Sequence, residues 1–408
     1  MAMVARTPCV GVLILVTLFG CGLINVADSL TIEQIGRRVP EPLWNQTRIS
    51  LRRYSDASES LSGPIPRELG SLTNLTYLDL SNHNLSGPIP PELGNLTNLV
   101  FLALSENRLS GPIPPELGNL TNLTYLELAP NSLSGPIPPE LGRPPAGRPN
   151  LPRSTSLLNT AFLLGRLTNL SQLILDNNNL SGPIPSELGS LVTKLYHLFL
   201  DNNNLSGPIP PELGNLTKLY NLYLSNNSLS GPIPPELGSL TNLNTLYLSN
   251  NSLSGPIPSE LGNLTNVGYL YLSNNSLSGP IPPELGNLTK LYYLFLDNNN
   301  LSGPIPQWLG RLSSQGLRLS NNSLSGPIPP SLHTSGYKGS FYPGNLELCC
   351  NGCYIAPPAR ERTSGVVERL LKVATGMVRD GRIRKHWSTR LSGMTTMRRK
   401  RKRTSTSR

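Results

Sequence analysis

Residues 229–252 read LSGPIPPELGSLTNLNTLYLSNNS, and near-copies of this 24-residue unit fill most of the chain. The hexapeptide LSGPIP occurs eleven times. Its copies begin at Leu61, Leu85, Leu109, Leu133, Leu180, Leu205, Leu229, Leu253, Leu277, Leu301 and Leu324. Units of this length stack into a solenoid, in which each unit contacts only its neighbours and the core lengthens with every copy. A chain of 408 residues can therefore form one elongated domain.

Each unit should form one coil with three parts. Residues 243–248 end in an alternation that predicts a short strand, with Tyr247 pointing outward between two inward leucines. The Gly-Pro-Ile-Pro segment cannot be helical, because two prolines fix φ and remove donors, so it should run extended along the back. Residues 235–238, Pro-Glu-Leu-Gly, predict a single 3-10 turn. We expect a mostly β, α/β solenoid with a parallel inner sheet and short 3-10 turns.

An asparagine follows the strand where the coil must turn, as Asn251 does. Its amide can point inward and satisfy backbone groups of adjacent coils, which would otherwise be buried unpaired. The first full repeat departs from this pattern with His83. The predicted ladder comprises Asn107, Asn131, Asn178, Asn203, Asn227, Asn251, Asn275, Asn299 and Asn322.

The pattern LxxLxLxxNxLSGxIPxxLG resembles the plant-type leucine-rich repeat, from Leu61 to about Gly336. The resemblance implies a right-handed superhelix like the extracellular domains of plant receptor kinases, receptor-like proteins and polygalacturonase-inhibiting proteins. In that family the inner sheet is the usual ligand face. Residues 341–349 resemble the family's C-terminal cap. The family's N-terminal cap with paired cysteines is not matched, because no cysteine lies between Asp28 and Ser60.

The N-terminus has the layout of a secretory signal. Arg6 precedes a charge-free apolar run over residues 10–24, so residues 1–27 are predicted to be a signal peptide. A membrane span needs about 20 apolar residues, which makes this run short for one. We expect a secreted, extracellular protein with no transmembrane span after signal removal. The alternative is a membrane anchor formed by an uncleaved signal.

The remaining chain divides by composition. We interpret residues 28–60 as an N-terminal cap or degenerate repeat, residues 61–336 as the solenoid, residues 337–358 as a C-terminal cap and residues 359–408 as a basic, disordered tail. The cap carries three cysteines, which allow one disulfide and a spare thiol. They are Cys349, Cys350 and Cys353. No second cysteine pair accompanies them, so we expect no metal site.

Regular spacing breaks once, between Leu133 and Leu180, which are 47 residues apart. Residues 143–161 contain no inner-strand pattern, no ladder asparagine and no Gly-Pro-Ile-Pro. About one unit's length is kept while its content is lost, so this stretch is either a functional loop or a frame-shifted piece of coding sequence. Either interpretation predicts that the array divides here into a weak N-terminal block and a longer C-terminal block.

The net charge of +10 is concentrated in the tail. Residues 360–408 hold 16 Lys/Arg and 3 Asp/Glu, whereas residues 1–359 hold 18 basic and 21 acidic residues. The nearly neutral body argues against a nucleic-acid partner. The basic tail would favour an acidic polysaccharide or a membrane surface, with a solvated tail of no function as the alternative.

The outward positions of the inner strands gather aromatic residues in the C-terminal half. The residue between the two inward leucines is aromatic in five consecutive coils, and neighbouring columns add five tyrosines. Exposed aromatics in such numbers indicate a recognition surface, although stacking between strands is the alternative. The candidate ligand-binding residues are Tyr196, Phe199, Tyr220, Tyr223, Tyr247, Tyr269, Tyr271, Tyr292, Tyr293 and Phe295.

No catalytic pattern appears, because the four histidines are dispersed and the recurrent glutamates belong to the 3-10 turns. We expect no enzyme activity and no cofactor. Asn-x-Ser/Thr occurs at 17 sites and predicts some N-glycosylation. The sequence favours an extracellular module that binds a protein or peptide on its concave aromatic face. The alternatives are a truncated receptor-kinase ectodomain and a wall-associated structural protein that holds acidic polysaccharide through its tail.

Overall fold

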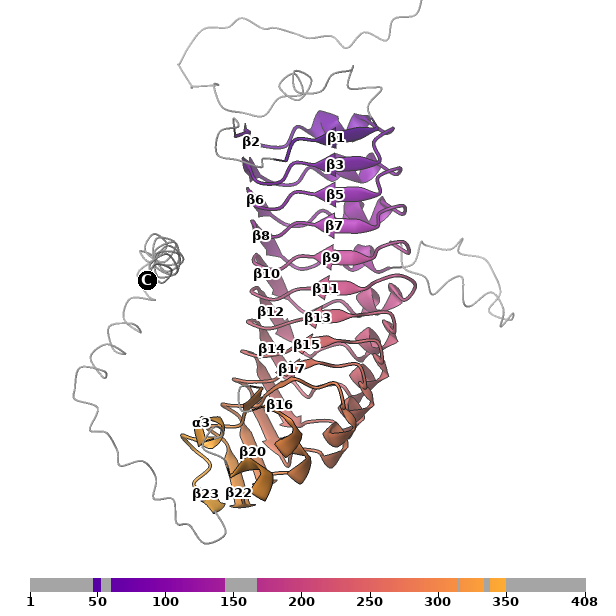
Figure 1. Ribbon diagram of the computed structural model, residues 1–408. Coiled ribbons are helices and arrows are strands. Elements are labelled where there is room, and N and C mark those ends of the chain that lie inside the picture. The colour runs from indigo at the N-terminus through magenta and orange to yellow at the C-terminus, as the bar shows by residue number, and fades with distance from the viewer. Residues whose placement is uncertain (1–46, 53–59, 144–166, 314–315, 334–337, 350–408) are drawn as a thin grey trace, which may run out of the picture. The chain divides into compact units, whose positions relative to one another are not determined.

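The computed structural model describes residues 47–52, 60–143, 167–313, 316–333 and 338–349, which stack as successive coils (Figure 1). The expected signal peptide, the basic tail, Cys350 and Cys353 lie outside the described residues. Each regular coil contributes an inner strand, a second strand and a 3-10 turn. The predicted solenoid of parallel strands and short 3-10 turns is confirmed.

The inner strands form an 11-stranded parallel sheet in chain order. Its strands are β1 (Arg48–Ser50), β3 (Tyr77–Asp79), β5 (Phe101–Ala103), β7 (Tyr125–Glu127), β9 (Gln172–Ile174), β11 (His197–Phe199), β13 (Asn221–Tyr223), β15 (Thr245–Tyr247), β17 (Tyr269–Tyr271), β19 (Tyr293–Phe295) and β21 (Leu317–Arg318). The central leucines pair in register, as Leu222, Leu246 and Leu270 do, so equivalent side chains of successive coils lie in columns. This register positions the candidate site.

A second parallel sheet of 12 strands runs along another side of the coils. Its strands are β2 (Ser62–Gly63), β4 (Asn84–Gly87), β6 (Arg108–Gly111), β8 (Ser132–Gly135), β10 (Asn179–Gly182), β12 (Asn204–Gly207), β14 (Ser228–Gly231), β16 (Ser252–Pro256), β18 (Ser276–Gly279), β20 (Asn300–Pro304), β22 (Ser323–Pro327) and β23 (Glu347–Cys349). The sequence predicted an extended back but not this pairing. The strands are too short to show alternation, and a glycine at positive φ, such as Gly231 at +78°, follows the buried leucine.

The predicted 3-10 turns form the third side of the coils. They are η2 (Arg67–Ser71), η3 (Pro91–Asn95), η4 (Pro115–Asn119), η5 (Pro139–Leu141), η6 (Ser186–Ser190), η7 (Pro211–Asn215), η8 (Pro235–Ser239), η9 (Ser259–Asn263), η10 (Pro283–Asn287), η11 (Gln307–Arg311) and η12 (Pro330–Leu332), followed by the α-helical turn α3 (Lys338–Phe341). The turns stack so closely that a Cβ on Gly238 would lie 2.4 Å from the carbonyl oxygen of Glu260. The glycine of Pro-Glu-Leu-Gly is therefore required by packing.

Aliphatic side chains fill the interior of every coil. In the coil of residues 229–252 seven of them are 1 % exposed or less. They are Leu229, Ile233, Leu237, Leu240, Leu243, Leu246 and Leu248. Burying a leucine fully contributes about 1.5–3 kcal/mol, so each coil adds substantially to the core only when its neighbours cover it.

The ladder asparagines lie inside the coils and bond to the backbone on both sides. The Oδ1 of Asn203 accepts the N–H of Leu180 at 3.0 Å. Its Nδ2 donates to the carbonyls of Leu175 at 3.0 Å and Leu200 at 3.2 Å. All nine predicted ladder residues accept a leucine N–H of the preceding coil in this way.

Other residues extend the ladder at both ends. His83 accepts the N–H of Leu61 through Nδ1 at 3.3 Å, and its Nε2 lies 2.6 Å from the carbonyl oxygen of Leu51. Asn345, in the segment that caps the C-terminal end, is 1 % exposed and accepts the N–H of Leu324 at 2.9 Å. The sequence marked His83 as a departure, whereas the imidazole makes the same kind of contacts as an asparagine.

The irregular stretch interrupts one coil and does not replace a unit. Strand β7 pairs directly with β9, and β8 with β10, so both sheets run on across residues 144–166. Asn169 donates to the carbonyl of Thr121 in the preceding coil at 3.1 Å. The expected division into two blocks is wrong for the sheets. The 47-residue spacing between Leu133 and Leu180 suggested a degenerate repeat, because an insertion of nearly one unit's length gives the same spacing as a unit that has lost its pattern.

Adjacent asparagines provide a matched test of the ladder. Asn203→Ala leaves a buried N–H and several carbonyls unpaired, so we expect it to lower the free energy of unfolding by about 1–3 kcal/mol. The side chain of Asn204 is exposed, so Asn204→Ala should change stability by less than about 0.5 kcal/mol. Urea denaturation measures both. Equal effects of the two variants would show that the buried amide is not what holds the coil.

Deletion tests whether the irregular stretch is an insertion. Removing residues 144–166 joins Arg143 to Leu167 and recreates the Leu-Gly-x-Leu-Thr-Asn-Leu spacing of the regular coils. Because β7 already pairs with β9 and β8 with β10, we expect an unchanged or slightly higher Tm by circular dichroism.

Removing residues 143–166 instead shortens the coil by one further residue, so we expect this control to melt several degrees lower. If the first deletion failed to fold, or if both melted alike, the segment would have to belong to the coils.

Candidate functional site

Five of the predicted aromatic residues form one continuous stack along the inner sheet. Ring centroids of successive coils are 4.4–4.5 Å apart, and the rings are within 23° of parallel. The stack comprises Phe199, Tyr223, Tyr247, Tyr271 and Phe295. The guanidinium of Arg318 closes its C-terminal end, 4.3 Å from the ring centroid of Phe295. Apart from the face of Phe199 toward the preceding coil, each ring face is covered by a ring or by Arg318, and the column presents mainly ring edges and phenol groups.

Stacking accounts for much of this column without a ligand. An aromatic pair adds about 0.5–1.5 kcal/mol beyond area burial. Burial and the neighbouring phenols raise the pKa of Tyr247 well above its ordinary value, so this hydroxyl stays a hydrogen-bond donor at neutral pH. Two further candidates, Tyr269 and Tyr293, stack on each other at 5.4 Å and meet the main column edge to face.

Three candidates point outward without a stacked partner. Tyr196, Tyr220 and Tyr292 are 48 %, 46 % and 67 % exposed, the largest values among the aromatic residues of the inner sheet. They share the position three residues before the stacked column, immediately before the inner strand. His197 meets Tyr220 edge to face at 6.3 Å, and burial lowers its pKa, which leaves the imidazole uncharged at neutral pH. These rings are the aromatic surface that a ligand can reach.

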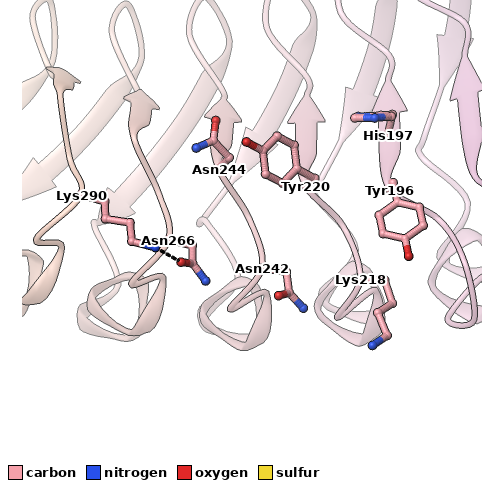
Figure 2. Close-up of a pocket in the computed structure, with 8 residues that line it drawn as sticks. All are labelled: Tyr196, His197, Lys218, Tyr220, Asn242, Asn244, Asn266 and Lys290. Atoms are coloured by element: carbon pink, nitrogen blue, oxygen red, sulfur yellow. Dashed lines mark hydrogen bonds between the residues drawn. The ribbon is translucent and has the colours of Figure 1, made fainter.

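A hollow of about 670 Å³ lies beside two of these exposed tyrosines, Tyr196 and Tyr220, at the start of the inner strands (Figure 2). Its lining residues come from five successive coils, and the sequence did not predict the lysines and asparagines among them. They are Tyr196, His197, Lys218, Tyr220, Asn242, Asn244, Asn266 and Lys290. A recurring Thr-Lys-Leu-Tyr in three coils was the available signal.

Aspartates lie at the opposite end of the inner strands. Burial, with the neighbouring Asp176 carboxylate adding to it, raises the pKa of Asp201 to about 6. Burial likewise raises the pKa of Asp176. Asp297 accepts a hydrogen bond from Ser273 at 2.5 Å. The candidate face thus has a cationic border with lysines and an acidic border, and the acidic border loses part of its charge in mildly acidic solution.

The N-terminal coils carry a second stack that the sequence did not reveal. Tyr77, Phe101 and Tyr125 stack at 4.3 and 4.4 Å, with Arg48 3.5 Å from the centroid of Tyr77. They occupy the position two residues before the main column, which Tyr269 and Tyr293 occupy in the C-terminal half. The main column is not aromatic in these N-terminal coils, so it gave no signal there. Asp79, in the main column, is 2 % exposed, and its Oδ2 accepts a hydrogen bond from the Tyr77 hydroxyl at 3.4 Å. The main column is therefore closed to ligands at this end.

Within the described residues, no group of three or more His, Cys, Asp or Glu side chains could hold a metal ion. Among the described helices, none has the length and apolar character needed to cross a bilayer. Of the predicted disulfide cysteines, Cys349 ends strand β23, while its two candidate partners lie outside the described residues.

The Leucine Rich Repeat family model matches ten segments of the chain. They are residues 74–96, 98–120, 122–143, 169–191, 194–216, 218–240, 242–264, 266–288, 290–312 and 315–335. The chain belongs to the leucine-rich-repeat family. The gap between the third and fourth matches contains the insertion described above. A search of the curated proteins gave no match.

Solved plant structures share this fold. The plant peptide hormone receptor RGFR1 in complex with RGF2 is 40 % identical over 69 % of this chain and 45 % of its own, with a TM-score of 0.54. A TDR receptor is 34 % identical over 67 % and 48 %, with a TM-score of 0.55. A plant ice-binding protein is 30 % identical over 68 % and 81 %, with a TM-score of 0.54. The chain thus spans about half the length of these two receptors.

Proposed function

We propose that this protein is an extracellular module that binds a peptide or protein ligand on the inner sheet between β11 and β19. The supporting observation is that Tyr196 and Tyr220 stand exposed and unstacked in the lining of the hollow, and that Tyr292, two residues after the lining residue Lys290, is also exposed. Large exposed aromatics at the rim of a concavity are typical hot spots of binding. The receptor RGFR1, which was solved with the peptide hormone RGF2, has similar repeats.

The main aromatic column has a different part in this proposal. Its rings cover one another, so it supplies a rigid floor whose phenols offer hydrogen bonds, and the exposed tyrosines supply the contact area. A rigid floor loses little conformational entropy when a ligand binds, which favours affinity. The alternatives of a truncated receptor-kinase ectodomain and of polysaccharide binding through the tail remain predictions.

The test measures affinity and stability separately. The ligands are dodecapeptides that a randomised display library yields by selection for binding to the unmodified protein. We expect Tyr220→Ala and Tyr292→Ala to weaken their binding by about 30-fold, equivalent to about 2 kcal/mol. Tyr247→Ala removes two stacked contacts, so we expect it to lower the free energy of unfolding by about 1–3 kcal/mol.

Val100→Ala is the matched control, because Val100 occupies the same column position as Tyr220 in a distant coil and is 39 % exposed. Both affinity and thermal melting are measured for every variant. Unchanged affinity in the two tyrosine variants, or an equal loss in the Val100 control, would contradict the proposal.

A second candidate function rests on the other sheet. The residue before each buried leucine of its strands is short, uncharged and exposed in nine coils, with Arg108 in β6 and Glu347 in β23 as the exceptions. These residues are Asn84, Ser132, Asn179, Asn204, Ser228, Ser252, Ser276, Asn300 and Ser323. Such a regular array of hydroxyl and amide groups can hold ordered water. Since the plant ice-binding protein is matched over 81 % of its length, ice is the ligand that this surface suggests.

Ice binding would appear as thermal hysteresis and as inhibition of ice recrystallisation. We expect Ser228→Lys with Ser252→Lys to abolish both effects by breaking the array, while Tyr220→Ala leaves them unchanged. A protein that shows neither effect at millimolar concentration would rule this candidate out.

A further inference from the structure

The hollow is built from two types of coil. Three coils carry Lys-Leu-Tyr at the start of the inner strand, beginning at Lys194, Lys218 and Lys290. The two coils between Lys218 and Lys290 carry asparagines in the lysine position, Asn242 and Asn266. They also carry a smaller residue in the tyrosine position. These two coils lie in the middle of the hollow, Lys218 and Lys290 flank them, and Tyr196 and His197 line the hollow one coil beyond Lys218 (Figure 2).

The coils with small residues place polar groups along the hollow. Asn242 donates to the carbonyl of Thr217 at 2.7 Å, and Asn266 donates to Thr241 at 2.8 Å, so both amides are held by the backbone. Lys290 leans inward and donates to the Oδ1 of Asn266 at 2.6 Å. These contacts fix the asparagines but leave hydrogen-bonding capacity on the side toward the hollow.

The charge of this hollow is uncompensated. No acidic side chain is among its lining residues, and the imidazole of His197 is uncharged at neutral pH because burial lowers its pKa. In the part of the chain that the structure describes, Lys218 makes no ion pair with an acidic group, and Lys290 bonds only to an amide. Two ammonium groups in a polar hollow rimmed by tyrosines fit carboxylates, which form the stronger charge-assisted hydrogen bonds.

The separation of the two lysines sets the spacing of those carboxylates. Three strand intervals of about 4.8 Å place the backbones of the two lysines roughly 14 Å apart. The Lys290 ammonium, which bonds to Asn266 one coil inward, reaches this spacing when its side chain turns back over its own coil. An extended peptide advances about 3.3 Å per residue, so residues i and i+4 are about 13 Å apart. Because successive side chains alternate sides, residues i and i+4 also face the same way. The geometry matches two acidic residues with three residues between them.

We propose that the hollow between Lys218 and Lys290 binds an extended peptide segment with Asp or Glu at positions i and i+4. The inference rests on the proposed peptide-binding function and adds the chemical class of the ligand. The peptide runs across successive inner strands, with one carboxylate at each lysine. Its backbone bonds to the asparagine amides, and its apolar atoms contact the rings of Tyr196 and Tyr220.

Fluorescent dodecapeptides with a common Ser/Thr/Val background test the spacing. We expect the peptide with Glu at i and i+4 to bind at least tenfold more tightly than its Gln counterpart. It should also bind more tightly than peptides with the two Glu at i and i+3, where the side chains face opposite ways. Raising the salt concentration should weaken the i, i+4 peptide and leave the Gln peptide nearly unchanged.

Protein variants locate the binding. Lys218→Gln and Lys290→Gln should each remove most of the tenfold preference, while Lys194→Gln, in the same column but outside the hollow lining, should keep it. Asn244→Tyr should block the peptide, since tyrosine already occupies this column position in three other coils. Val100→Tyr, in the same column of a distant coil, is its control and should bind normally.

The outcomes distinguish this inference from the function on which it rests. If library dodecapeptides bind through Tyr220 and Tyr292 but show no preference for paired acids, the charged-spacing inference is overturned and the peptide-binding function stands. If no dodecapeptide binds, both fail. Retention of soluble polygalacturonate that depends on Lys218 and Lys290, without peptide binding, would also overturn the inference in favour of a polysaccharide.

Discussion

The coils depend on one inward-facing side-chain amide each, with the imidazole of His83 in its place in the first full repeat. The chain must turn after each inner strand inside an apolar core, where an unpaired backbone group would cost about 1–3 kcal/mol. The ladder asparagine removes that cost by bonding to the coil before it and to its own coil, as Asn227 does with Leu205 and Leu224. Because this bond links successive coils, it also sets their register. The columns of side chains on the inner sheet follow from that register.

A backbone held this way leaves the outward positions free to vary. The inner strands keep the same leucines and the same pairing register from coil to coil. The outward positions in and just before them nevertheless hold stacked rings, exposed rings, lysines or asparagines. Stability and recognition therefore use different positions of the same strand. The stacked column rigidifies the face, whereas Lys218, Tyr220 and Lys290 occupy positions where the fold imposes no residue type. In this architecture, function has to be inferred separately for each column of outward-facing side chains on the inner sheet.

The fold could be predicted from one repeat because its periodicity, prolines and glycine each have a direct structural meaning. Two features could not. The two asparagines of each Asn-Asn pair have different roles that the sequence does not distinguish. Asn250 adopts the left-handed backbone conformation of the turn, with a φ of 57°, whereas the side-chain amide of Asn251 accepts the N–H of Leu229. The insertion of residues 144–166 was misread, because only the pairing of β7 with β9 shows that one coil spans it. The aromatic surface was predicted, but stacking was not separable from exposure without the ring geometry.

Amide hydrogen exchange resolved to single residues tests the central role of the ladder most directly. The N–H groups of Leu205 and Leu253 donate to ladder amides at 3.0 Å, so both should exchange only through global unfolding. In an Asn227→Ala variant, the amide of Leu205 should exchange much faster, while that of Leu253, which bonds to Asn275, stays protected. Fast exchange of both amides in the unmodified protein, or unchanged protection of Leu205 in the variant, would contradict the account.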